Sequence, residues 1–472
     1  AGITHRGHGL SATWWDWNGD GWLDLWVGND FNDADCLYVN RGDGTFVDVV
    51  NMAVGHTAWF SMGADFGDLN DDGLSDFLIA DMAGSNHFKQ KTAMGSMSAF
   101  AWFMDNVEPA QLMRNGLFLN AGNGRFLEGA FLSGLDSTDW TWAVRLCDFD
   151  HDGLNDAYFQ CGMSRNFNEN DDEELKKKDR KLTQWERYRH LPPLREHNRV
   201  FRNLGGMNFE NTSKDWGLDY YGMSYGCAVG DLDQDGALDI VSVRLDGPVA
   251  IYHNTGADAG NSLTLSFEGT KSNKQGLGVK AKLFTNHDDE TPQLRTLVTS
   301  RGYLGSDQAI LHFGLGEAST AARLELSWPS GLTQTIRNLD AGRHHHIVEG
   351  RGASATPPVV RPEPVFEALP SLSRVKHAEK RYDDFAREPL LPNKLSQFGP
   401  GQAWSDVNGD GVDDFYLGQG KGAPGRLIIL RDRQEGLKPM PLPNDGDFED
   451  MGSLFFDADG DGDQDLYIVS GG

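Results

Sequence analysis

Acidic and amide side chains recur at fixed intervals in six nine-residue segments of this 472-residue chain. Each segment reads Asp, any residue, Asp or Asn, any residue, Asp, Gly, two residues of any type, and Asp. Oxygen-bearing side chains at alternate positions of a tight turn can converge on one point. That arrangement suits Ca²⁺, a hard cation that takes about six to eight oxygen ligands. Glycine at the sixth position permits a sharp backbone reversal that a Cβ would resist. The pattern therefore predicts calcium loops.

The predicted ligands are the side chains at positions 1, 3, 5 and 9 of each loop and the main-chain carbonyl of position 7. In chain order, the residues of the six loops are Asp16, Asn18, Asp20, Trp22 and Asp24 (loop 1); Asp68, Asn70, Asp72, Leu74 and Asp76 (loop 2); Asp148, Asp150, Asp152, Leu154 and Asp156 (loop 3); Asp231, Asp233, Asp235, Ala237 and Asp239 (loop 4); Asp406, Asn408, Asp410, Val412 and Asp414 (loop 5); and Asp457, Asp459, Asp461, Asp463 and Asp465 (loop 6). The expected cofactor is Ca²⁺, up to six ions with one in each loop. A single copy would be explained equally well as a polar turn, but six copies at one spacing favour metal binding.

The residues that follow each loop argue against an EF-hand. An EF-hand lies between two helices and closes with a bidentate Glu at position 12. Position 12 is occupied here by Val27, Ile79, Phe159, Ser242, Leu417 and Ile468. In five loops the last Asp begins a short apolar run rich in β-branched and aromatic residues, which is typical of a buried strand. Each loop is therefore expected to join two strands.

A hairpin signal follows each of the first three loops. An apolar run, an Asn, a Gly-containing turn and a Phe recur over residues 37–46, 117–126 and 200–209. One unit of strand, loop, strand and hairpin supplies the four antiparallel strands of a propeller blade. Loops 1 and 2, and loops 5 and 6, are about fifty residues apart and fit plain blades. The longer intervals hold insertions at 82–113, which is expected to pack as a cap, and at 168–198, a charged helical stretch.

The chain divides on composition into four parts. Residues 1–258 carry four loops and form the first set of blades, and residues 260–350, with alternating strands, form a separate β module. Residues 351–365 include four prolines and are expected to be an extended linker. Residues 366–472 carry the last two loops. We expect a first propeller cut at its N-terminal side and the start of a second. The alternative is one discontinuous propeller with the module inserted.

The charge and the cysteines limit the partners and the compartment. A net charge of −28 disfavours nucleic acid and anionic membranes, and no apolar stretch is long enough to insert into a bilayer. Clustered calcium loops of low affinity suit compartments with millimolar Ca²⁺, so a secreted, periplasmic or cell-surface protein is expected. The four cysteines, Cys36, Cys147, Cys161 and Cys227, are compatible with disulfides in several pairings or with buried thiols.

Two sets of residues resemble known families. The blades resemble the FG-GAP/VCBS repeats of integrin-type propellers, most clearly at Phe398-Gly399, loop 5 and residues 422–424. The 260–350 module resembles the ASPIC/UnbV domain of the bacterial, cartilage acidic protein-like type. Its marks are residues 276–279, 300–303, 312–316 and 328–331. The resemblance implies an all-β fold, with calcium-binding propeller blades and a small β-sandwich-like module.

The function expected from these features is not catalytic. The resemblance implies an extracellular or cell-surface protein for adhesion, recognition or scaffolding, with an unknown protein or glycan ligand. The alternatives are a calcium-dependent propeller enzyme acting on polysaccharide or ester, and a support region for a catalytic domain outside this sequence. Against an enzyme, the chain lacks a His-Glu-x-x-His helix and a Cys/His zinc spacing. No catalytic residue is assigned.

Overall fold

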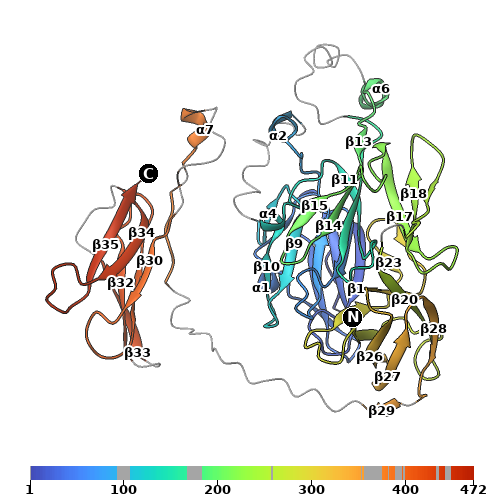
Figure 1. Cartoon of the computed structure of the whole chain (residues 1–472). Helices are drawn as coiled ribbons and strands as arrows, with labels where there is room; N and C mark the ends of the chain where they lie inside the picture. Colours follow the sequence, from blue (N-terminus) through green and yellow to red (C-terminus); the bar gives the residue numbers. More distant parts are fainter. Residues whose placement is uncertain are drawn as a thin grey trace. The chain divides into compact units, whose positions relative to one another are not determined.

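The fold is all-β with a few short helices (Figure 1). The structure, a computed structural model, describes residues 2–92, 107–166, 183–256, 259–351, 353–355, 375–380, 382–388, 396, 399–431, 435–441 and 448–471. The insertions expected at 82–113 and 168–198 lie partly outside these residues, and most of the 351–365 linker does too. The chain forms two compact units, Ala1–Val359 and Val360–Gly472, which are described separately.

Three antiparallel sheets of four strands lie in the first unit. We call them sheets 1 to 3. Their strands in spatial order are β1 (His8–Trp15), β2 (Asp24–Asp30), β3 (Cys36–Asn40) and β4 (Phe46–Asp48); β6 (Ala64–Gly67), β7 (Asp76–Ile79), β9 (Gly116–Asn120) and β10 (Phe126–Glu128); and β11 (Thr141–Cys147), β12 (Asp156–Cys161), β14 (Arg199–Asn203) and β15 (Phe209–Asn211). The predicted hairpins are confirmed in register, because each repeated Asn pairs with the repeated Phe, as in Asn120↔Phe126.

A fourth sheet has three strands. Sheet 4 consists of β17 (Ser224–Gly230), β18 (Asp239–Arg244) and β19 (Ala250–Tyr252). Two short strand pairs, β5 (His56–Ala58) with β8 (Ala110–Leu112) and β13 (Glu196–His197) with β16 (Tyr221–Gly222), link the sheets. The helices that the structure describes in this unit are α1 (Val50–Ala53), α2 (His87–Thr92), α4 (Ala130–Ser133) and α6 (Gln184–His190).

Aromatic side chains fill the space between neighbouring sheets. Trp15 of sheet 1 stacks on Phe66 of sheet 2 with ring centroids 5.6 Å apart, and Trp26 packs on Phe77 at 4.7 Å. These side chains belong to one buried apolar cluster, and sheets 2 and 3 share a second such cluster. Burying one aromatic side chain stabilises the folded state by roughly 2 kcal/mol. The aromatic contacts between sheets therefore supply much of the stabilisation that comes from the core.

The module packs two sheets around a single apolar core. One sheet is β25 (Leu311–Gly316), β20 (Asn261–Glu268) and β28 (Arg343–Val348); the other is β22 (Gln293–Thr296), β21 (Lys280–Phe284), β26 (Thr320–Ser327), β27 (Leu332–Asp340) and β29 (Ala353–Ala355). Alternate residues of β20, namely Leu263, Leu265 and Phe267, face Leu324 and Leu326 of β26 in that core. The predicted alternation of this segment is thus explained by burial of one face.

A hairpin of the module reaches the first strands of the four sheets. It consists of β23 (Ser300–Arg301) and β24 (Gly305–Ser306). Strand β1 contacts β6, β6 contacts β11 and β11 contacts β17, while β24 contacts β17 and β23 contacts β1. Gly302 donates its N–H to the carbonyl of Ala64 at 2.9 Å. The module is therefore part of the same compact unit as the sheets.

The second unit repeats the sheet pattern. Strands β30 (Gln402–Ser405), β31 (Asp414–Leu417), β32 (Arg426–Arg431) and β33 (Glu435–Pro441) form a four-stranded sheet, and β34 (Glu449–Phe456) pairs with β35 (Asp465–Gly471). A short helix, α7 (Asp384–Arg387), lies before them in the sequence.

The four cysteines are buried free thiols, which is the second of the two predicted possibilities. Among the described residues, no helix has the length and apolarity needed to cross a bilayer.

Candidate calcium sites

All six loops connect two antiparallel strands, as predicted. In each, the strand residue before position 1 pairs with the Asp at position 9, for example Trp15↔Asp24 in loop 1 and Phe456↔Asp465 in loop 6. The same register closes loops 2 to 5. Positions 1 to 8 therefore form a short loop, and the pairing of the two strands fixes both of its ends.

The first carboxylate of each loop organises the turn. The Asp16 carboxylate accepts hydrogen bonds from the N–H groups of Asp20 at 3.1 Å and Gly21 at 2.7 Å. In every loop the glycine at position 6 donates to the Asp at position 1. Each of these glycines has a positive φ, between 81° and 97°. The prediction that glycine at position 6 permits a sharp backbone reversal is confirmed.

Position 4 also adopts a left-handed conformation, which the sequence reasoning missed. Glycine occupies it in loops 1, 5 and 6, but Asp71, His151 and Gln234 hold φ values of 60°, 64° and 65° in loops 2, 3 and 4. A non-glycine residue in this region costs roughly 1 kcal/mol. The three glycines at position 4 were the available signal.

The ninth carboxylate ties the loop to the hairpin of its own sheet. Asp76 accepts the N–H of Asn120 at 2.8 Å and the N–H of Leu69 at 2.9 Å, and Asp156 is bonded in the same way. The hairpin asparagine was not predicted as functional, although it recurs in the sequence. The Nδ2 group of Asn120 donates to the Trp17 carbonyl at 2.8 Å, so it also bonds loop 1 of the preceding sheet.

The same amide bridge recurs between the following sheets. Asn203 donates to the Leu69 carbonyl of loop 2 at 3.0 Å, and Asn254 donates to the Phe149 carbonyl of loop 3 at 2.9 Å. Each bridge joins position 2 of one loop to the hairpin of the next sheet. The loops of the first unit are therefore connected to one another through backbone carbonyls.

Several loop carboxylates are buried without enough partners. The pKa values of Asp24, Asp76 and Asp148 are raised to about 7, chiefly because burial penalises the charged form. Neighbouring carboxylates of the same loop contribute to each increase. Buried oxygens of Asp24 (Oδ2), Asp148 (Oδ1) and Asp231 (Oδ1) accept no hydrogen bond. A buried polar atom without a partner is rare, and a bound cation would satisfy all three.

Three loops bring carboxylate oxygens within 4.8 Å of one another. The groups are Asp148, Asp150 and Asp156 in loop 3; Asp231, Asp233 and Asp235 in loop 4; and Asp457, Asp459 and Asp465 in loop 6. These are the three loops with Asp at position 3. Loops 1, 2 and 5 carry Asn at that position, so they offer fewer acidic ligands. Their lower negative charge predicts a weaker affinity for a cation in loops 1, 2 and 5.

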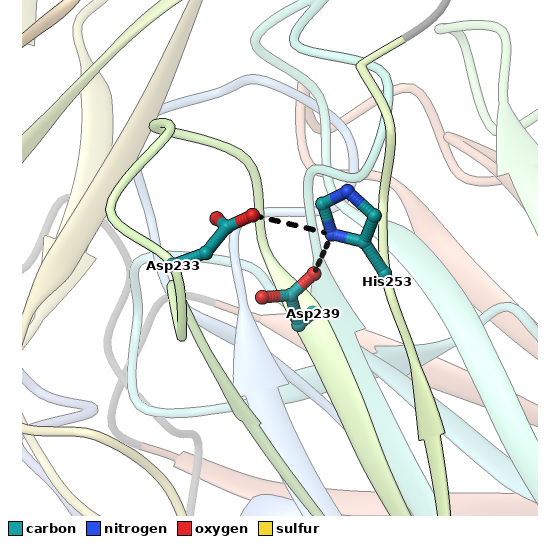
Figure 2. Close-up of side chains that lie close together, drawn as sticks. All are labelled: Asp233, Asp239 and His253. Carbon is teal, nitrogen blue, oxygen red and sulfur yellow. Dashed lines mark hydrogen bonds and ion pairs between the residues drawn. The ribbon is translucent and has the colours of Figure 1, made fainter.

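Histidine 253 stands beside loop 4. Its Nδ1 atom is 3.3 Å from Asp239 Oδ1 and 3.5 Å from Asp233 Oδ2 (Figure 2). Figure 2 shows the imidazole of His253, which directly follows β19, pointing toward both carboxylates. The sequence reasoning did not single out this residue, although its place directly before Asn254 in the hairpin was the available signal.

Basic side chains lie beside loops 1 and 3. Lys280 of the module contacts Asp16, and the Arg202 Nε atom lies 2.5 Å from Asp150 Oδ2. The module also bonds loop 3 through its backbone, because the Gly314 N–H donates to Asp148 at 3.1 Å. The half-buried Arg295 donates to the Gly153 carbonyl at 3.2 Å. The module therefore covers part of loop 3, while Asp152 stays exposed.

These residues fit a divalent cation. The donor set is hard oxygen, the carboxylates outnumber the nearby cations, and buried oxygens lack partners in three loops. Bound Ca²⁺ would offset the like charges that raise the pKa values of these groups.

Two family models match separate segments of the chain. Residues 269–354 match the model described as ASPIC and UnbV, and residues 16–79 match the model described as FG-GAP-like repeat. The second segment contains loops 1 and 2. Both resemblances predicted from the sequence are confirmed.

Cartilage acidic protein 1 is similar to this chain in several animals. The human protein is 24% identical over 331 residues, which cover 69% of this chain and 41% of the relative. The Xenopus tropicalis protein is 24% identical over 69% of this chain and 42% of its own length. The mouse protein is 25% identical over 65% and 40%. The chain thus spans about two fifths of the length of these relatives.

Two solved structures were also matched. One is an Agrocybe aegerita lectin described by its recognition of non-reducing terminal N-acetylglucosamine, with a TM-score of 0.25, 13% identity, and coverage of 92% of this chain and 80% of that chain. The other is the V. cholerae biofilm matrix protein Bap1, with a TM-score of 0.23, 11% identity, and coverage of 97% and 73%. These scores are too low to support an argument about this chain.

Proposed function

We propose that this chain is a calcium-binding, non-catalytic repeat protein of an extracellular or cell-surface compartment, which serves adhesion, recognition or scaffolding. The observation that carries the proposal is the set of buried carboxylate oxygens without partners in loops 1, 3 and 4. The FG-GAP-like and ASPIC/UnbV matches support an extracellular repeat protein. In this proposal the four sheets and the module hairpin form a propeller-like ring.

The calcium ions act as structural ligands of the sheets. Up to six Ca²⁺ ions are held by positions 1, 3, 5 and 9 of the loops, with the carbonyl of position 7 as an additional ligand. Each ion offsets the repulsion among carboxylates at the end of one strand pair. Because only the folded loop presents the ligands together, calcium binding adds to folding stability. At a concentration ten times the Kd, each site contributes about 1.4 kcal/mol.

Calorimetric titration and thermal unfolding test the proposal. We expect several calcium sites with Kd values of roughly 0.1–1 mM and a Tm that is higher in millimolar Ca²⁺ than in EDTA. The variant D148N removes a ligand of loop 3 and is expected to lose one site and to lower the Tm in calcium. The control D288N changes an exposed aspartate outside the loops. Equal Tm values in calcium and EDTA would refute the structural role of calcium.

A further inference from the structure

Among the residues that the structure describes, sheet 4 has no counterpart of the fourth strand that completes sheets 1 to 3. Its hairpin begins as the others do: the N–H of Asn254 donates to Asp239 at 2.8 Å, and the N–H of Gly256 donates to Asn254 Oδ1 at 3.1 Å. The chain then runs into β20 of the module instead of returning along β19. In the part of the chain that the structure describes, β19 pairs with β18 alone, so one edge of this strand is open.

In sheets 2 and 3 the fourth strand fills a space against the preceding sheet. Phe126 of β10 packs on Trp17 of loop 1, with ring centroids 5.1 Å apart. Phe209 of β15 packs into the cluster that contains Leu69 of loop 2. Trp17 and Leu69 both occupy position 2 of their loops, and Phe149 occupies that position in loop 3. The missing strand of sheet 4 would thus place its aromatic side chain against Phe149.

That space is open in sheet 4. A cavity of about 710 Å³ lies there. Its apolar walls are formed by Phe149, Trp216, Leu218, Ile240, Ile251 and Tyr252. Ile251 of the open strand is 67% exposed and pairs with Val241 of β18, whereas the buried Ile240 pairs with Tyr252 on the other face of the sheet. The size and lining of this cavity suit an aromatic side chain. In sheets 2 and 3 an aromatic side chain fills the equivalent space.

We propose that this groove binds an extended peptide segment of another protein. The segment adds to the free edge of β19 as a fourth strand and inserts an aromatic side chain beside Phe149, opposite Asn254. Backbone hydrogen bonds to the strand edge supply affinity, and the aromatic pocket supplies specificity. This inference goes beyond the proposed function. Because Asp150 of the lining belongs to loop 3, its test is made at a fixed calcium concentration.

Charge and topology favour a different chain over a second copy. The groove is lined by Asp150 and Asp215, and the chain carries a net charge of −28, so a neutral or basic segment is preferred. Arg202 of the lining is already paired with Asp150. The chain's own Phe-bearing fourth strands β4, β10 and β15 are each paired within their sheets, so a second copy has none of them to donate.

Calorimetry with a short synthetic peptide tests this proposal. The probe is the capped segment of residues 123–129, Asn-Gly-Arg-Phe-Leu-Glu-Gly, which has the sequence of a native fourth strand. We expect a Kd in the micromolar range for the folded chain in millimolar calcium. The peptide carrying F126A is expected to bind at least tenfold more weakly. The protein variant I251D is expected to weaken binding of the parent peptide at least tenfold.

A matched variant controls for the added charge. V243D places an aspartate on β18 at a position that is 48% exposed and outside the cavity lining, and it is expected to leave peptide affinity unchanged. Circular dichroism checks that both variants are folded. Equal affinity of the wild type and I251D for the peptide, or no binding to the wild type, overturns the proposal. Dimerisation of the wild type that I251D abolishes would assign the groove to a second copy and also overturn it.

Discussion

The buried ion pair between the module and sheet 2 offers a quantitative test of how the two parts are held together. Asp65 is fully buried, and its Oδ1 atom accepts a hydrogen bond from Arg301 Nε at 2.6 Å. Arg301 also donates to the Phe66 carbonyl at 2.8 Å. The variant R301M keeps much of the side-chain volume but removes the cation, and it leaves a buried carboxylate without its neutralising partner.

The expected loss is large because one charge remains buried. Removing one member of a buried ion pair typically destabilises a protein by about 3–5 kcal/mol. Arg145, which is also buried near Asp65, pairs with Asp307 at 3.3 Å and can compensate in part, so we expect a loss near the lower value, about 3 kcal/mol. Because the unfolding entropy grows with chain length, that loss lowers the Tm of the unit Ala1–Val359 by only about 4 °C.

Urea unfolding of the full chain in saturating calcium measures the effect. The double variant D65L/R301M replaces both charges by apolar groups and is expected to regain most of the loss, because no unpaired charge remains. The control R343M breaks an exposed pair with Asp340, both more than 60% exposed, and is expected to cost less than about 1 kcal/mol. A loss below about 1 kcal/mol for R301M, or purely additive losses in the double variant, would refute the reasoning.

Two further predictions concern buried groups outside the loops. Burial alone would raise the pKa of Glu349, but hydrogen bonds from Ser330, Ser272 and Lys271 outweigh it and lower this pKa to about 2. The carboxylate therefore stabilises the fold fully above its ordinary pKa near 4.5, and this stabilisation is lost as the pH falls toward 2. We expect E349Q to cost about 2 kcal/mol at pH 7 and to flatten the acid limb of urea stability measured from pH 5 to 2.5. An unchanged acid limb would contradict this assignment. Burial raises the pKa values of the four cysteine thiols, to about 12 for Cys161. We expect no reaction with a thiol reagent such as DTNB in the native chain and four reactive thiols in urea; rapid labelling of the native chain would exclude the buried arrangement.

The sequence predicts the loops well because their chemistry is local. The spacing of the aspartates and the glycine at position 6 follow from the turn itself, so strand, loop and strand could be placed without tertiary information. The hairpin register was predictable for the same reason: Asn120 and Phe126 are close in the chain and pair directly.

The contacts made across long sequence separations could not be predicted. Nothing local in residues 300–306 indicates that this hairpin contacts both β1 and β17, because the partners are more than 70 residues away in the sequence. The positions of Lys280 and Arg295 beside loops 1 and 3 follow from that docking. His253 was missed because its proximity to Asp233 and Asp239 depends on the fold of loop 4, and only its place before Asn254 in the hairpin could have indicated it.

The amide bridges between sheets have a consequence for how calcium acts on the chain. The side chains of Asn120 and Asn203 each donate a hydrogen bond to a backbone carbonyl in the loop of the adjacent sheet. An ion that orders a loop therefore also orders the carbonyl that accepts this hydrogen bond from the neighbouring sheet. Occupancy should therefore spread by nearest-neighbour coupling, as in linear repeat arrays. Calcium titration of the first unit is then expected to be cooperative, and replacing a single bridging asparagine by alanine should split it into independent steps.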